Sequence, residues 1–276
     1  MAEETRSFDS AWLKFGWAVA HADALNNEIE AHAKSTKGQT PFKTRKYYDP
    51  QRHCIVLAIE SIEPLPVRWG LLFGDVVYGF RSALDHVAWA VVARGTIPTL
   101  TEQQERNVLF PISRRREDFN SSLGRRLPGA RRADVAVIRR YQPYQRGKRN
   151  LSNHVLAILN GLSNDDKHRS VQPVWALPDS AVWSIGDISD CVLTRPSPRA
   201  PRETLKVGTE LVRLYVRKTG PDPDIEMYGE ISADIAINER IWLQNWFDET
   251  TRFINKLLRE FASPPKDLRE QVGRAA

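Results

Sequence analysis

Apolar residues recur every three or four positions in several stretches of the chain, a spacing that predicts amphipathic helices. The helices expected on this basis cover Asp9–Ala33, Pro66–Arg94, Ala133–Arg140, Leu151–Ser163 and Glu239–Phe261. Other stretches are rich in β-branched and aromatic residues and are separated by turn residues, as strands are. The expected strands cover Phe42–Tyr48, Cys54–Ser61, Ser170–Leu177, Ala181–Ile188, Glu210–Arg217 and Ile225–Ile237.

The order of these elements predicts an α+β fold, because helices and strands are segregated along the chain rather than alternating as βαβ units. We expect a mainly helical, bundle-like region over residues 1–169. An antiparallel β-rich region closed by a long C-terminal helix is expected over residues 170–262, followed by a flexible tail over 263–276. The turn Asp49-Pro50-Gln51-Arg52 is expected to join the first two strands, and a loop is expected after Gly95.

The helix expected over Pro66–Arg94 has two unlike faces. Its core stripe consists of Trp69, Phe73, Val76, Val77, Phe80, Leu84, Val87 and Val91. The opposite face carries Asp75, Tyr78, Arg81, Ser82, Asp85, His86 and Trp89, and the helix contains no lysine and no glutamate. A solvated helix face normally carries those two residues. The pattern therefore predicts that this face meets another helix, a second subunit or a ligand.

Positive charge is concentrated in one segment. The chain has a net charge of +6, and residues 114–149 alone hold twelve arginine or lysine residues against three acidic ones. Eleven of the twelve are arginine, whose planar fork suits phosphate, so a polyanion such as RNA is a candidate partner. The alternative is a solvated loop with no partner. The candidate nucleic-acid-binding residues are Arg114, Arg115, Arg116, Arg125, Arg126, Arg131, Arg132, Arg139, Arg140, Arg146, Lys148, Arg149, Lys167 and Arg169, with Tyr141 and Tyr144 for base stacking.

The remaining composition excludes several classes of protein. Cys54 and Cys191 show no CxxC spacing, which excludes a disulfide framework and a thiolate zinc site. The first residues lack the basic and apolar regions of a signal peptide. No apolar run approaches the ~20 residues that span a bilayer. We therefore expect a cytoplasmic protein in a reducing compartment, with no membrane partner.

Four short segments resemble those of a widespread family of uncharacterised bacterial proteins. They are Gly74-Asp75 with Arg81-Ser82-Ala83-Leu84-Asp85-His86, Phe110-Pro111-Ile112, Gln142-Pro143-Tyr144, and Asp166-Lys167-His168-Arg169. Together they cover about residues 70–170. The resemblance implies no activity.

The spacing of Arg81 and His86, R-x4-H, also resembles the motif of the HEPN ribonucleases. That resemblance implies a helical, dimeric, metal-independent RNA endonuclease without a cofactor, acting as a toxin or in phage defence. Arg81 would stabilise the phosphate, and His86 would act in acid–base catalysis on a ribose 2′-OH, leaving a 2′,3′-cyclic phosphate. The alternative is a non-catalytic or structural face, in which Arg81 pairs with Asp85 at i,i+4. His86 lies about 140° round the helix from Arg81.

The segment Asn164–Arg169 admits three interpretations. Short Asx side chains and cations there can simply close a helix end. Alternatively Asp166, His168 and Arg169 complete a charged pocket beside the Arg81–His86 face, with Asp166 orienting His86 or His168. A metal held by His86, Asp85 or Asp75, His168 and Asp166 is the third, and no HExxH spacing supports it. The catalytic candidates are thus Arg81, Asp85, His86, Asp166 and His168. The role of the β-rich half stays open.

Overall fold

The computed structural model describes residues 7–35, 41–95, 99–147, 151–168, 173–176, 182–194, 204–230, 234–237 and 241–273. The described helices are α1 (Asp9–Ser35), α2 (Val67–Ala93), α3 (Glu102–Asn107), α4 (Arg116–Arg126), α5 (Arg132–Arg140), the 3-10 helix η2 (Pro143–Arg146), α6 (Val155–His168), α7 (Leu243–Arg259) and α8 (Leu268–Gly273). The described strands are β1 (Phe42–Asp49), β2 (Cys54–Ile62), β3 (Pro173–Ala176), β4 (Val182–Ser189), β5 (Cys191–Leu193), β6 (Glu210–Lys218), β7 (Asp224–Glu230), β8 (Asp234–Ile237) and β9 (Ile241–Trp242). Segregated helices and antiparallel strands confirm the α+β class.

The chain folds into two compact units, and each unit is made of separate stretches of sequence. The helical unit comprises Met1–Glu28, Arg68–Val171 and Gln244–Ala276, and the β-rich unit comprises Ile29–Val67 and Gln172–Leu243. This division differs from the single boundary expected at residue 169. The β1–β2 hairpin belongs with the later strands because β2 pairs with β6.

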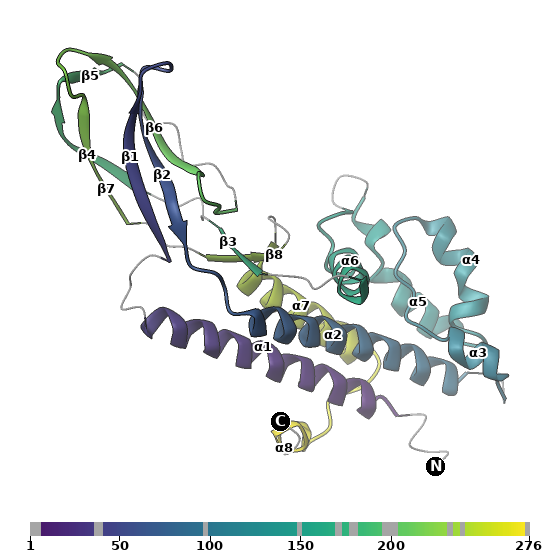
Figure 1. The fold of residues 1–276 in the computed structure, drawn as a ribbon. Coiled ribbons are helices and arrows are strands. Elements are labelled where there is room, and N and C mark those ends of the chain that lie inside the picture. The colour runs from purple at the N-terminus through teal and green to yellow at the C-terminus, as the bar shows by residue number, and fades with distance from the viewer. Residues whose placement is uncertain are drawn as a thin grey trace. The chain divides into compact units, whose positions relative to one another are not determined.

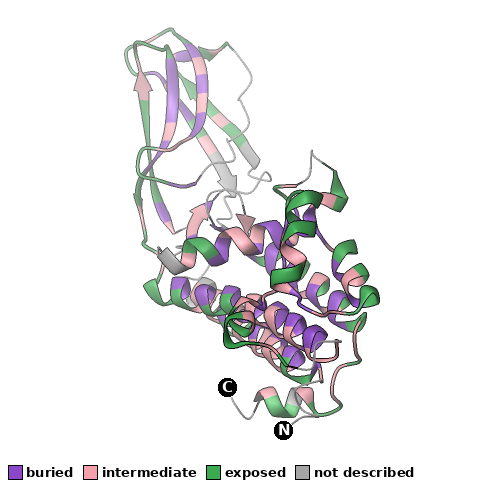
Figure 2. Cartoon of the chain, turned by 90° about the vertical axis from the view of Figure 1, so that its right-hand side faces the viewer, coloured by how far each residue is buried: buried purple, intermediate pink, exposed green. Residues whose placement is uncertain are grey.

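The core of the helical unit lies between α1, α2 and α7. Figure 1 shows α1 and α2 side by side. An ideal Cβ on Gly79 of α2 would lie 2.8 Å from the Cβ of Ala18 of α1, so the two helices approach too closely for a larger residue there. Trp246 of α7 packs against Phe73 and Phe80 of α2. All the residues expected in the α2 core stripe are buried, and Figure 2 shows such buried positions on the facing sides of the helices.

Two helices occupy the expected loop after Gly95. α3 follows Thr101, whose side chain accepts a hydrogen bond from the Gln104 N–H. The Gln104 side chain in turn accepts the Thr101 N–H, which completes a capping box. α4 buries only Phe119, and its acidic first turn and basic last turn complement the helix dipole. α5 is anchored to the end of α2, because both carboxylate oxygens of buried Asp134 accept hydrogen bonds from Arg94.

The bounds of α6 and the structure of the C-terminal tail also differ from expectation. α6 begins at Val155 rather than Leu151 and continues to His168, through the residues that were expected to end it. The expected flexible tail contains α8. Val272 of α8 lies so close to α1 that a Cβ on Gly16 would stand 2.8 Å from its Cγ2 atom. No described helix combines the length and the apolar character that a membrane crossing requires.

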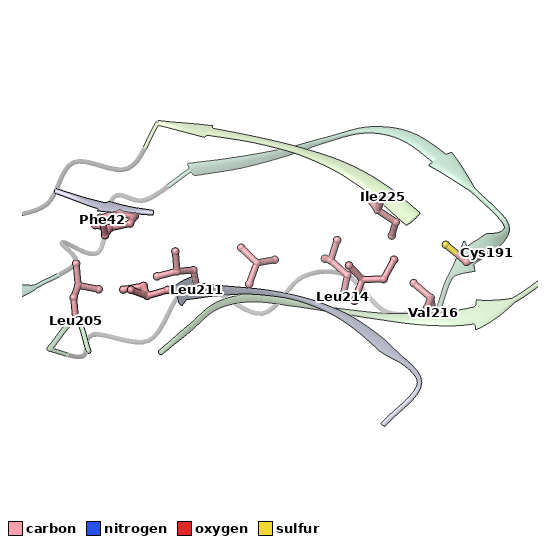
Figure 3. Packing of buried hydrophobic residues seen from close by; sticks show 10 residues of the cluster. Phe42, Cys191, Leu205, Leu211, Leu214, Val216 and Ile225 are labelled. Carbon is pink, nitrogen blue, oxygen red and sulfur yellow. The ribbon is translucent and has the colours of Figure 1, made fainter. Parts of the chain in front are cut away.

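Among the residues that the structure describes, the strands of the β-rich unit pair in three antiparallel sheets, with strand orders β1-β2-β6-β5, β3-β8-β9 and β4-β7. The expected turn between β1 and β2 is present, and Asp49 closes it by accepting hydrogen bonds from the N–H groups of Gln51 and Arg52. Figure 3 shows the core of this unit, in which Leu214 of β6 and Ile225 of β7 point toward each other from opposite strands. Both cysteines are buried and free.

Candidate functional site

Arg81 and Asp85 hold the backbone of Phe110. The Arg81 Nη2 group donates hydrogen bonds to Asp85 Oδ1, at 2.8 Å, and to the Phe110 carbonyl oxygen, at 3.0 Å. The same Asp85 oxygen accepts the Phe110 N–H at 2.9 Å. Both side chains are largely buried, at 15% and 21% exposed. Two α2 side chains therefore satisfy both polar backbone groups of one residue, as a neighbouring strand would.

Gln142 completes the same arrangement from the other side. Its Nε2 group donates to the Pro111 carbonyl at 2.9 Å and to the Ile138 carbonyl at 3.3 Å, and its Oε1 atom accepts the Ser113 N–H at 2.9 Å. The Gln142 residue is fully buried. We call this set, in which Arg81, Asp85 and Gln142 hold residues 110–113, the clamp. The clamp joins the Arg81–His86 segment to the Phe110–Ile112 and Gln142–Tyr144 segments.

The fourth segment meets α2 two helical turns before Arg81. An ideal Cβ on Gly74 would lie 2.9 Å from Oδ1 of Asp166, so the Asp166 carboxylate packs on α2 where a glycine leaves room for it. A larger residue at position 74 would therefore collide with the Asp166 carboxylate. The side chains of Lys167 and His168, together with the whole of Arg169, lie outside the described residues.

His86 interacts electrostatically with one residue of α1 and with one residue of the clamp. Burial lowers the pKa of His86, the positive charge of Lys14 on α1 lowers it further, and Asp85 opposes both effects. The imidazole is therefore neutral at pH 7. Arg81 instead contacts Phe110, and its Nη1 atom is buried without a hydrogen-bond partner in the described part of the chain. Asp85 therefore interacts with both residues, through its ion pair with Arg81 and through its charge on His86.

Seven exposed arginines of the basic segment form no ion pair with any described carboxylate. They are Arg114, Arg115, Arg116, Arg125, Arg131, Arg132 and Arg146, and we call them the arginine surface. Arg140 instead pairs at 2.9 Å with Glu260, which follows the end of α7, and Arg139 lies over the Phe119 ring. Half-buried Arg126 binds the Asn107 carbonyl, and burial and its arginine neighbours Arg125 and Arg81 lower its pKa. Lys148 and Arg149 lie outside the described residues.

Several of these arginines stand at the beginnings of helices. Arg115 is the N-cap residue of α4 and Arg131 that of α5, and neither side chain forms a capping hydrogen bond. Arg116 and Arg132 are the first helical residues. A cation at a helix N-terminus is electrostatically unfavourable, because the helix dipole is positive there. These arginines therefore add positive potential at two places where the fold gains nothing from it.

The two tyrosines expected to stack on bases are engaged within the helical unit. The Tyr141 hydroxyl donates to Glu260 at 3.0 Å, and burial and that carboxylate raise the pKa of Tyr141 to about 12. Its ring meets Phe253 edge to face, and the Tyr144 ring meets Phe119 in the same manner. Burial also raises the pKa of Tyr144. These contacts give both rings a structural role.

Comparisons of the chain with protein-family models, with curated proteins and with solved structures return no match. Among the side chains that the structure describes, no three histidine, cysteine, aspartate or glutamate groups gather as metal ligands do, and His168 is not one of these side chains. Sequence reasoning did not identify Arg252 and Lys256 of α7, which border a basic depression. Their i,i+4 spacing places both cations on one helix face, and this spacing could have indicated a basic site in the sequence.

Proposed function

We propose that the protein binds nucleic acid, with RNA as the expected ligand, through the arginine surface. The observation that carries this proposal is the placement of exposed arginines at the N-termini of α4 and α5, where they form no ion pair with a described carboxylate. Guanidinium groups pair bidentately with phosphate, and backbone N–H groups at helix N-termini also favour anions. A phosphate backbone offers a row of such anions at regular intervals.

The clamp favours binding without catalysis. Arg81 uses Nη2 to join Asp85 and Phe110, so its interactions stabilise the fold. A ribonuclease site would need the guanidinium of Arg81 to act on a phosphate, whereas its Nη2 group is already bound to Asp85 and to the Phe110 carbonyl. Nucleic-acid binding on the arginine surface requires neither group.

Three charge-removing substitutions test the arginine surface. In an Arg115→Gln/Arg131→Gln/Arg132→Gln variant we expect single-stranded RNA affinity at 0.1 M salt to fall at least about tenfold. The slope of log affinity against log salt should become shallower by about 2, since each lost phosphate contact releases fewer counterions. Stability should not fall, because the three side chains form no capping bond. Fluorescence anisotropy over a salt series measures the affinity, and DNA of the same sequence tests the preference for RNA.

The matched control removes three arginines that are paired elsewhere. Arg52, Arg68 and Arg106 are exposed and pair with Glu210, Glu28 and Glu102. An Arg52→Gln/Arg68→Gln/Arg106→Gln variant has the same net charge as the test variant and should keep wild-type affinity to within about threefold. An equal loss in the two variants would show that total charge alone drives binding and would remove the proposed surface.

RNA cleavage at Arg81 and His86 is the second candidate, favoured by the neutral imidazole that a general base requires. His86→Gln is the informative substitution, because replacing Arg81 also removes part of the clamp. For a binding protein we expect RNA to stay full-length in EDTA with the wild type and with His86→Gln. Products ending in a 2′,3′-cyclic phosphate, made by the wild type and not by His86→Gln, would establish the ribonuclease instead. Gel analysis with end-group mapping gives the readout.

A further inference from the structure

A basic depression lies on the helical unit where η2, the beginning of α6 and the middle of α7 meet. Its volume is about 460 Å³, and Arg146, Arg252 and Lys256 contribute to its lining. A second depression of about 500 Å³ on α7 shares Arg252 and Lys256 with the first and adds Arg259. The shared residues make the two depressions neighbours along one helix. We refer to the first as the α7 pocket.

The charges that line the α7 pocket are mainly positive. Three cationic side chains face one carboxylate there, that of Glu249. Arg252 donates from Nε to the Asp248 carbonyl, which leaves its two Nη groups for other partners. Arg146 and Lys256 form no ion pair with any carboxylate in the described ranges. Three cations beside one carboxylate leave a net positive charge in the pocket, so an anionic ligand would stabilise the arrangement.

The first turn of α6 adds to this positive potential. The Nδ1 atom of His154 accepts the Leu156 N–H at 3.2 Å, and the His154 carbonyl accepts the N–H groups of Ala157 and Ile158. Burial first and the charge of Arg146 second lower the pKa of His154 to about 4, so the imidazole is neutral at physiological pH. With Nδ1 as an acceptor, the ring proton is on Nε2. His154 therefore caps the helix without adding a charge, and the helix dipole supplements the three cations.

We propose that the α7 pocket binds a phosphate group. Arginine pairs with phosphate oxygens in a planar, bidentate manner, and lysine supplies a compact charge for the remaining oxygen. The pocket volume exceeds that of a single phosphate, which leaves room for the rest of a nucleotide. The phosphate can belong to a nucleic-acid strand, because Arg146 is part of both the arginine surface and the pocket. It can equally belong to a free nucleotide, so the pocket does not depend on the proposed nucleic-acid binding.

Thermal denaturation in the presence of inorganic pyrophosphate tests the pocket. A ligand that binds only the folded protein raises the Tm as its concentration exceeds the Kd. We expect this rise with the wild type, relative to sodium chloride of the same ionic strength. Arg146→Gln and Lys256→Gln should each require at least about fivefold more pyrophosphate for the same rise. Lys266→Gln is the matched control, since Lys266 is exposed and lies outside the pocket, and it should behave as the wild type. No rise in the wild type, or the same rise in all four proteins, overturns the proposal.

Displacement of labelled RNA identifies the source of the phosphate. If the pocket holds a strand phosphate, pyrophosphate should displace RNA from the wild type at concentrations at least about fivefold below those needed for Lys256→Gln. If it holds a free nucleotide, pyrophosphate should raise the Tm without this difference in displacement. If pyrophosphate stabilises the protein and the protein binds no RNA, the phosphate site in the α7 pocket is supported and the proposed nucleic-acid binding is wrong. The two proposals can therefore fail separately.

Discussion

We expect a Gln142→Leu variant to lose about 3 kcal/mol or more of its free energy of unfolding, since each buried group left unpaired costs roughly 1–3 kcal/mol. The Gln142 amide satisfies the Pro111 carbonyl, the Ile138 carbonyl and the Ser113 N–H, and water does not reach it. Leucine has a similar volume, so the substitution removes the hydrogen bonds and leaves little new cavity. Denaturation in urea, monitored by circular dichroism, measures the loss.

Gln145→Leu is the control for this experiment. Gln145 lies three residues farther along, is exposed, and donates one hydrogen bond to the Arg139 carbonyl. Because water can replace that bond, we expect its loss to change stability by about 0.5 kcal/mol or less. If the two leucine variants are equally stable, Gln142 does not support residues 110–113, and the clamp is not a unit of the fold.

The helices of the core could be predicted because their burial repeats at helical spacing. Residues from Trp69 to Val91 recur on one side of α2, and each member of that stripe is buried. α4 offered no such repeat, since it buries Phe119 alone and its other residues are mostly exposed. α3 buries no residue and could be recognised only by its capping box, Thr101 with Gln104. Local capping thus identifies short surface helices that hydrophobic periodicity does not.

Strand pairing was less accessible to sequence analysis than the strands themselves. The β1–β2 hairpin follows from two short strands and a turn with Asp49, all within about twenty residues. Its pairing with β6 joins Val56 to Arg213, more than 150 residues later, and no local pattern encodes such a partner. Each unit consists of separate stretches of sequence because of this long-range pairing and because α7 packs on α2.

The residue types on the polar face of α2 predicted only part of its contacts. The absence of lysine and glutamate predicted that this face meets another helix, a second subunit or a ligand, whereas Arg81 and Asp85 bind the backbone of the loop residue Phe110. The pairing of the two residues was one of the expected alternatives, and the structure confirms it. Their partner, the backbone of Phe110, was not predictable, because a backbone group has no sequence signature. The same face also holds Tyr78, which is exposed. A helix face without lysine and glutamate thus includes both largely buried and solvent-exposed residues.

Removing the Asp85 carboxylate should have the largest effect of any substitution in the clamp. Asp85→Leu leaves the mostly buried Arg81 guanidinium without its ion-pair partner and the Phe110 N–H without its acceptor. We expect a loss of about 3–5 kcal/mol, as for other buried pairs that lose one member. Asp85→Asn keeps an oxygen at the same place and should lose roughly 1–2 kcal/mol, because the hydrogen bonds persist without the charge. Chemical denaturation of both variants measures the difference.

The control for Asp85 is Asp75, which stands on the same helix with its side chain 63% exposed and its carboxylate 3.8 Å from His21 Nδ1. Asp75→Leu should lose about 0.5 kcal/mol or less. Equal losses at the two positions would mean that Asp85 does not anchor Phe110, and Arg81 would then be available to a ligand. Suppose that Asp85→Leu unfolds the protein and Asp75→Leu does not. A substitution at Arg81, which belongs to the same clamp, would then also reduce the folded fraction. Any loss of activity in an Arg81 variant would have to be corrected for that fraction. The stability of the clamp therefore decides whether substitutions at Arg81 can report on chemistry.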